Sequence, residues 1–265
     1  MLTGFLIIFR ETLEVALVVG IVLAYLVKIK KFEYRKFVWW GVAFGVLASL
    51  AGAIIFTALF GGLTGRTEEI FEGTLMFVAA GLLTTMILWM MKQGKYVTQR
   101  LEARVEKEIT KKHALGLMAL VFFAVLREGI ETVIFMGAAS RVEAMNIVGP
   151  LLGLLAALVV GWATFWGAIK LKLEMFFRIT SILLIFFAAG LIAHGIHEFQ
   201  EAAVLPVIVE KVWDTNWLIY EKGWLGSILK ALFGYNADPS LLEVLGWLSY
   251  LALSFGVYRT IERTR

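Results

Sequence analysis

The chain has 265 residues, of which 60% are hydrophobic and only 17% are charged, and its mean hydropathy is +0.82. Soluble domains are typically about 45–50% apolar and about 25% charged, so the composition excludes an ordinary soluble protein and predicts a single transmembrane domain over residues 1–265. The absence of cysteine excludes disulfides and thiolate metal sites. The net charge of +4 does not indicate nucleic-acid binding, because a membrane protein sorts its charges by side.

Seven apolar runs are long enough to cross a bilayer, which takes roughly 17–25 helical residues. We therefore predict an all-α fold of seven transmembrane helices, and the N-terminal run is interpreted as a retained helix, since no basic segment precedes it. The runs cover about 2–27, 37–60, 70–91, 114–139, 147–169, 176–198 and 241–258.

Lysine and arginine are distributed unevenly between the connections. Of the 25 such residues, 18 lie in alternate connections, namely 28–36, 92–112, 170–178 and the tail from 259. Only five lie in the opposite connections, and two lie inside apolar runs. Basic residues are retained on the cytoplasmic side, so we predict a cytoplasmic-membrane protein with its N-terminus outside and its C-terminus in the cytoplasm.

The first and fourth runs each contain the pattern R-E-x-x-E, as Arg10 to Glu14 and, 117 positions later, Arg127 to Glu131. An ionised side chain at the centre of a spanning helix costs roughly 2.5–3.5 kcal/mol and usually marks an ion or proton path. Helical spacing places each Arg beside the Glu one turn on, so we predict an ion pair within each copy. The candidate metal ligands are Glu11, Glu14, Glu128 and Glu131, with Arg10 and Arg127 as their charge partners.

Four carboxylates and two guanidiniums leave a charge of about −2, which would attract a multivalent cation such as iron, manganese, magnesium or calcium. The alternative interpretation is that these groups form salt bridges that only hold the bundle together. In the predicted topology the two copies lie in antiparallel helices, which makes the segments about 1–91 and 114–200 inverted repeats, a common transporter architecture. The seventh helix lies outside the repeat.

Three other segments are informative. Gly41 with Gly45, Gly149 with Gly153, and Gly161 allow helices to approach closely. Mixed charges between 93 and 113 predict a solvated cytoplasmic helix, which includes His113. The outer loop of about 199–240 carries several tryptophans, which favours short helices at the outer interface.

Two further groups of ligand-type side chains lie toward the outer side. Glu68, Glu69 and Glu72 begin the third helix, where they are either an outer collection site or simple complements of the helix dipole. His194, His197, Glu198 and Glu201 follow the i, i+3, i+4, i+7 stripe at the end of the sixth helix. Imidazole with carboxylate suits ferrous iron, zinc or manganese, so this stripe is a second candidate metal site.

These motifs resemble those of the high-affinity iron permeases, which comprise the fungal oxidase-coupled permease and bacterial inner-membrane relatives. The resemblance rests on RETLE and REGIE in the first and fourth helices, on the E-x-x-E element from Glu69 to Glu72, and on the H-G-x-H-E-x-Q-E ending from His194. It implies seven helices, iron transport, and Glu11, Glu14, Glu128 and Glu131 as permeation ligands. It further implies iron as the transported substrate with no tightly bound cofactor, and a periplasmic or extracellular partner that oxidises or delivers iron.

Three alternatives remain open at the level of sequence. The chain could carry another metal, such as manganese, zinc or lead. It could be a membrane di-metal carboxylate enzyme, although such bundles use Glu-x-x-His pairs that neither motif contains. It could also be a proton-coupled or sensory protein that uses the acids as a relay. The sequence does not determine whether the chain forms a homo-oligomer.

Overall fold

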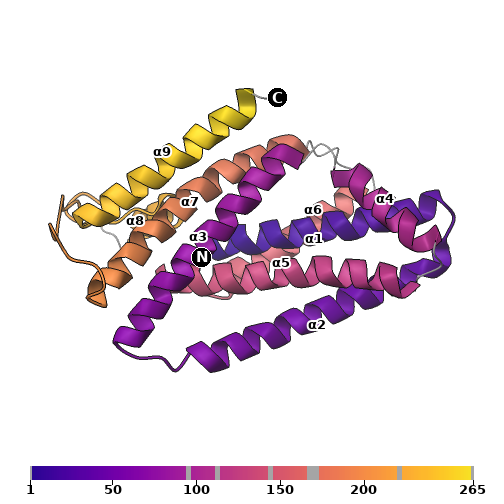
Figure 1. Cartoon of the computed structure of the whole chain (residues 1–265), viewed down its shortest axis with the longest axis horizontal. Helices are drawn as coiled ribbons and strands as arrows, with labels where there is room; N and C mark the ends of the chain where they lie inside the picture. Colours follow the sequence, from indigo (N-terminus) through magenta and orange to yellow (C-terminus); the bar gives the residue numbers. More distant parts are fainter. Residues whose placement is uncertain are drawn as a thin grey trace.

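The computed structural model describes residues 2–93, 97–110, 114–142, 146–165, 173–219 and 223–263. These residues form helices and connections without a strand, so the predicted all-α fold is confirmed for them (Figure 1). A short 3-10 helix at Phe32–Tyr34 joins the first two long helices. The α-helices are α1 (Leu2–Lys28), α2 (Arg35–Phe60), α3 (Arg66–Gln93), α4 (Val97–Thr110), α5 (Ala114–Val142), α6 (Val148–Phe165), α7 (Leu173–Glu201), α8 (Trp224–Phe233) and α9 (Leu241–Arg263).

Within the described residues, five helices are long and apolar enough to cross a membrane, so the protein is a multi-pass membrane protein. The five segments are Phe32–Phe60, Arg66–Trp89, Val148–Phe165, Thr180–Glu201 and Leu241–Thr260. The other two long helices, α1 and α5, have 27 and 29 residues, but each carries an R-E-x-x-E pattern in its middle. Each predicted run matches one long helix, except that residues 166–169 of the fifth run lie outside the described residues.

The long helices pack in pairs through small residues. In α2, a Cβ atom on Gly45 would lie 2.7 Å from Val125 Cβ in α5. In α6, a Cβ atom on Gly153 would clash with the Phe5 carbonyl oxygen in α1. The predicted close approach at these glycines is therefore confirmed. In each pair, the residue numbers at successive contacts increase along both helices. α2 therefore runs parallel to α5, and α6 runs parallel to α1.

The contacts of Gly45 predict a specific packing defect. Gly45→Ala is expected to destabilise the protein by about 1–3 kcal/mol, because the added methyl group overpacks the α2 to α5 contact. Gly52→Ala in the same helix is the matched control, since a Cβ atom there meets nothing within 4 Å. Thermal unfolding in detergent measures both variants, and equal melting temperatures would contradict this account of the contact.

The other helix contacts involve α3, α4, α7 and α9. α3 and α7 run antiparallel, with Gly73 beside Gly195 and Phe199, and α9 packs along α7 and also contacts α3. α4 is the predicted helix of the charged connection, but it is not solvated all round. Its Val105 is fully buried against α1, α2 and α5, where it joins Leu26 and Leu117. His113 lies outside the described residues.

The outer connection differs from its prediction in part. Residues 202–219 form turns, bends and irregular segments rather than short helices, and α8 is the one helix among the described residues of this connection. α8 packs against α7: Phe233 and Phe186 lie edge to face at 5.3 Å, and Gly234 directly contacts Gly190. α8 is thus held against the bundle. Tyr220 lies outside the described residues.

Candidate functional site

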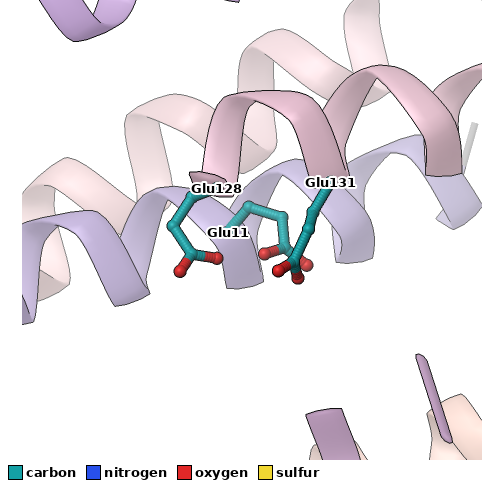
Figure 2. A group of neighbouring side chains, drawn as sticks. All are labelled: Glu11, Glu128 and Glu131. Carbon is teal, nitrogen blue, oxygen red and sulfur yellow. The ribbon is translucent and has the colours of Figure 1, made fainter. Parts of the chain in front are cut away.

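The central feature is a cluster of acids where α1 and α5 cross in opposite directions. Glu11 comes from α1, and Glu128 and Glu131 come from α5 (Figure 2). Each offers one carboxylate oxygen, and these three oxygens lie within 4.8 Å of one another. Among the described residues, no other group of three acidic, histidine or cysteine side chains meets that criterion. Two patterns far apart in sequence therefore build one site.

In the first R-E-x-x-E pattern, both glutamates form ion pairs with the arginine. Arg10 Nη1 lies 2.8 Å from Glu11 Oε1, and Nη2 lies 2.7 Å from Glu14 Oε1. The predicted pair of Arg10 with Glu14 is thus formed. Arg10 also donates a hydrogen bond of 2.7 Å to the Met86 sulfur of α3. Only 3% of its side chain is exposed, so the guanidinium is fixed inside the bundle.

The second pattern forms the same pair in more open surroundings. Arg127 Nε donates a hydrogen bond of 2.8 Å to Glu131 Oε1, and it lies 3.7 Å from Glu128 Oε1. Half of the Arg127 side chain is exposed, in contrast to Arg10. Its guanidinium lies 5.8 Å from the ring centre of Trp89, which is within cation–π range.

The acids retain unused ligand capacity. Glu11 Oε2, Glu128 Oε2 and Glu131 Oε2 are buried and accept no hydrogen bond within the described part of the chain. A buried polar atom without a partner is costly and rare in native structures. Carboxylate oxygens are ligands for hard and borderline cations, so a cation between the two helices would satisfy these atoms.

The outer acids also come together, because α3 and α7 lie side by side there. Arg141, at the end of α5, forms ion pairs with Glu68, at 3.2 Å, and with Glu72. Glu198 of α7 interacts electrostatically with Glu72, Glu69 and Glu201. These five acids, Glu68, Glu69, Glu72, Glu198 and Glu201, are called the outer acidic group below.

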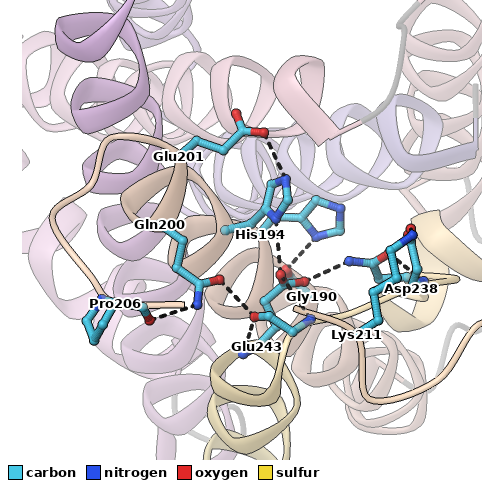
Figure 3. A network of polar contacts seen from close by, with 11 residues as sticks. Gly190, His194, Gln200, Glu201, Pro206, Lys211, Asp238 and Glu243 are labelled. Atoms are coloured by element: carbon cyan, nitrogen blue, oxygen red, sulfur yellow. Dashed lines mark hydrogen bonds and ion pairs between the residues drawn. The ribbon is translucent and has the colours of Figure 1, made fainter. Parts of the chain in front are cut away.

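The two histidines of the α7 stripe are engaged within the protein. His194 is buried, and its Nδ1 lies 3.0 Å from the Gly190 carbonyl oxygen one turn earlier (Figure 3). His197 Nδ1 lies 3.0 Å from Glu243 Oε1 of α9, and its Nε2 lies 3.3 Å from Glu201 Oε1. Both nitrogens of His197 therefore face carboxylates, and it would bind a cation only after leaving one of them.

Sequence reasoning missed Glu243, which is 3% exposed and gathers the network drawn in Figure 3. Besides His197, it accepts hydrogen bonds from Asn236 Nδ2 at 2.7 Å and from the Ser240 backbone N–H at 3.3 Å. A signal was present, since Ser240 followed three residues later by an acid is a capping pattern at the start of α9. The carboxylate thus ties α7, α9 and the preceding connection together.

This network gives a prediction about stability. Glu243→Ala is expected to cost about 1–3 kcal/mol, because three buried or half-buried donors lose their acceptor. The matched control is Glu201→Ala, since the Glu201 side chain is 56% exposed and contacts the same histidine. The melting temperatures of the purified variants are the measurement. A Glu201→Ala protein as unstable as Glu243→Ala would contradict the stabilising role of the Glu243 network.

The fold and the central cluster together define a multi-pass helical membrane protein with a buried group of carboxylate oxygens between two helices. The model of the iron permease FTR1 family matches residues 1–261. The chain is 37% identical over 256 residues to the ferrous iron permease EfeU of Yersinia pestis, covering 95% of this chain and 90% of that protein. It is 35% identical over 255 residues to the ferrous iron permease EfeU of Escherichia coli O6:H1, covering 95% and 92%. No solved structure matches the chain.

The chain therefore belongs to the iron permease FTR1 family. It is a transporter and not an enzyme, and iron is its substrate, so the alternative of a di-metal carboxylate enzyme is set aside.

Proposed function

We propose that the chain carries iron into the cell across the cytoplasmic membrane through the site formed by Glu11, Glu14, Glu128 and Glu131. The observation that carries this proposal is the convergence of three carboxylates from α1 and α5, whose oxygens lie within 4.8 Å of one another. The relatives are named ferrous iron permeases, and we extend the ferrous form to this chain. With all groups ionised, the four acids and two arginines carry about −2, which a divalent ion neutralises without excess charge.

The proposal includes seven crossings of the membrane, with α1 and α5 among them. The motif acids face each other instead of lipid, since Glu11 and Glu128 are 2% and 7% exposed, and this burial lowers the cost of placing them at membrane depth. The predicted orientation, with the N-terminus outside, is retained. It places α4 and the start of α5 in the cytoplasm, and the outer acidic group outside.

The helix pairs support an inverted repeat of α1 to α3 with α5 to α7, followed by α9 as an addition. In this repeat, α1 is equivalent to α5, α2 to α6, and α3 to α7. The parallel pair of α1 with α6 is therefore equivalent to the parallel pair of α5 with α2, and both pairs are present. The antiparallel pairs of α1 with α5 and of α3 with α7 map onto themselves. Such symmetry brings equivalent residues together near the middle of the membrane.

The proposed route begins at the outer acidic group. Glu68, Glu69, Glu72, Glu198 and Glu201, with His194 and His197, attract the cation, because clustered charge of one sign raises the local concentration of the opposite ion. A periplasmic partner that delivers iron would meet the protein here. The ion then reaches the central acids, where Arg10 and Arg127 balance the charge that the metal leaves uncompensated.

A second candidate substrate is another divalent metal, such as manganese, zinc or lead. It is favoured by the central donors, which are all carboxylate oxygens and discriminate weakly among divalent ions. Uptake of radioactive iron into proteoliposomes, under reducing and under oxidising conditions, tests both candidates. We expect the protein to take up ferrous iron faster than manganese, zinc or lead, each measured in the same way. Uptake of manganese that exceeds uptake of iron would assign the other substrate.

A further inference from the structure

One contact between α2 and α5 falls directly between two of the central acids. Gly129 follows Glu128 and lies two positions before Glu131. A Cβ atom on Gly129 would clash with both side-chain atoms of Ser49 in α2, whereas the Ser49 Cα atom would lie 3.6 Å from it. The Ser49 side chain therefore fills the space that any larger residue at position 129 would need.

The Ser49 hydroxyl group is already engaged within its own helix. Its Oγ donates a hydrogen bond of 2.8 Å to the Gly45 carbonyl oxygen, one turn earlier. Rotation of the side chain would move Oγ, but it would leave Cβ in place, because the α2 backbone fixes that atom. The contact with Gly129 is thus a contact of size, and α2 and α5 would have to separate to admit a larger residue.

The first motif copy shows which contact is equivalent. In α2, Gly45 lies against the Phe122 carbonyl group of α5, and in α6, Gly153 lies against the Phe5 carbonyl group of α1. Phe122 and Phe5 are 117 positions apart, as are the two motif copies. In the proposed repeat, Gly45 and Gly153 are therefore equivalent, and so are the residues one turn after them.

One turn after these glycines, the two copies divide the available volume in opposite ways. α2 carries Ser49 opposite Gly129, whereas α6 carries Ala157, and the residue equivalent to Gly129 is Thr12. Ala157 is fully buried in a cluster with Leu13 of α1. Each copy thus combines one hydroxyl-bearing residue with one smaller residue, but the smaller one lies on the motif helix only in the second copy.

The position of α5 determines where its two acids lie. Glu128 and Glu131 are 7% and 9% exposed, and each has a buried Oε2 atom without a hydrogen-bond partner among the described residues. Their carboxylates meet Glu11 of α1, while Gly129 between them rests on α2. Metal–oxygen distances tolerate changes of only about 0.2 Å. The shift that would relieve a clash at position 129 is larger than this tolerance.

We propose that Ser49 is a positioning residue of the central site, whose contact with Gly129 sets the distance of the α5 acids from Glu11. This inference rests on the iron-binding role proposed above for the central acids. It assigns a role in iron binding to α2, which supplies no ligand. It also accounts for glycine in the second motif copy where the first has threonine.

Compensating substitutions test this contact. Gly129→Ala is expected to bind ferrous iron at least about tenfold more weakly than the parent, as is typical when a residue that supports a metal ligand is changed. The double variant Ser49→Gly with Gly129→Ala removes both clashing atoms from α2, so it should regain most of the parental affinity. Anaerobic equilibrium dialysis measures the dissociation constants. Parental affinity of Gly129→Ala, or a double variant no tighter than Gly129→Ala, would overturn the proposal.

A second double variant keeps the test valid even if Gly129→Ala does not fold. Ser49→Ala with Gly129→Ala removes Oγ but retains the clashing Cβ atom of residue 49. It is therefore expected to bind iron more weakly than Ser49→Gly with Gly129→Ala. Equal affinities of the two double variants would contradict a contact of size.

A packing defect elsewhere in the same helix pair is the matched control. A Cβ atom on Gly41 would lie 2.6 Å from the Met118 carbonyl oxygen, and Met118 precedes Glu128 by ten positions. Gly41→Ala is expected to lower the melting temperature while it keeps the parental iron affinity. If it weakened iron binding as much as Gly129→Ala, general loss of packing would explain both variants, and the positioning role would fail.

The positioning role is separable from the proposed function. Ferrous iron binding to Glu131→Gln, measured in the same way, reports on the central acids irrespective of Ser49. If Glu131→Gln loses iron while Gly129→Ala binds it like the parent, only the positioning role fails. If Glu131→Gln binds iron like the parent, the central site itself fails.

Discussion

Glu131→Gln is expected to abolish iron uptake, with a loss of at least about 100-fold. Substitutions of residues that merely support a metal ligand typically cost 10- to 100-fold in affinity or activity, and Glu131 supplies a carboxylate oxygen to the cluster directly. The amide keeps the shape of the side chain but removes one negative charge from the site. Radioactive iron uptake into proteoliposomes, normalised to the amount of reconstituted protein, is the measurement.

The matched control for this substitution is Glu33→Gln. Glu33 lies in the short 3-10 helix between α1 and α2, where its side chain is 60% exposed and 3.6 Å from Lys31. It carries the same charge, but it is remote from the cluster, so parental uptake is expected. Uptake by Glu131→Gln at the rate of Glu33→Gln would mean that the ion does not use the central acids.

Arg10→Met is expected to have the second largest effect, a loss of stability of about 3–5 kcal/mol. Removing one partner of a buried ion pair leaves an uncompensated charge, and Arg10 compensates both Glu11 and Glu14. Methionine fills much of the same volume beside Met86, so the loss reports on charge rather than on a cavity. Thermal unfolding of the purified variant in detergent measures it.

Arg127→Met provides the comparison for this prediction. Because Arg127 is half exposed, solvent partly stabilises the carboxylate charge that its removal leaves unpaired. We expect it to destabilise the protein by less than half as much as Arg10→Met. Bound ferrous iron should restore part of the stability of Arg10→Met, since a ligand that binds the native state stabilises it. Equal melting temperatures for the two variants would contradict the inequality between the two motif copies.

Local spacing was enough to predict the ion pairs of Arg10 with Glu14 and of Arg127 with Glu131, because residues four apart on a helix are always neighbours. The convergence of Glu11 with Glu128 is a long-range contact, and it was predicted only because the motif occurs twice. The glycine contacts of α2 and α6 were likewise visible as spaced small residues.

Other features could not be predicted from the pattern. Arg10 is buried and Arg127 is half exposed, a difference that identical motifs cannot reveal. Glu243 contacts His197 across 46 positions, and no motif connects these two residues. Residues 202–219 carry apolar and aromatic side chains that favoured helices, yet they form turns and backbone contacts to the segment before α9, such as Val212 N–H to the Pro239 carbonyl oxygen. Each of these features involves tertiary contacts, which the local sequence pattern does not reveal.

The most direct test is the amount of ferrous iron bound per chain, measured by anaerobic equilibrium dialysis of the parent protein, Glu11→Gln, Glu128→Gln and the double variant. The two substitutions lie on different helices, but the account places both carboxylates on one ion. It predicts that each single variant and the double variant lose the same single high-affinity iron. If each single variant lost a different iron, so that the double variant lost two, the shared site between α1 and α5 would be contradicted.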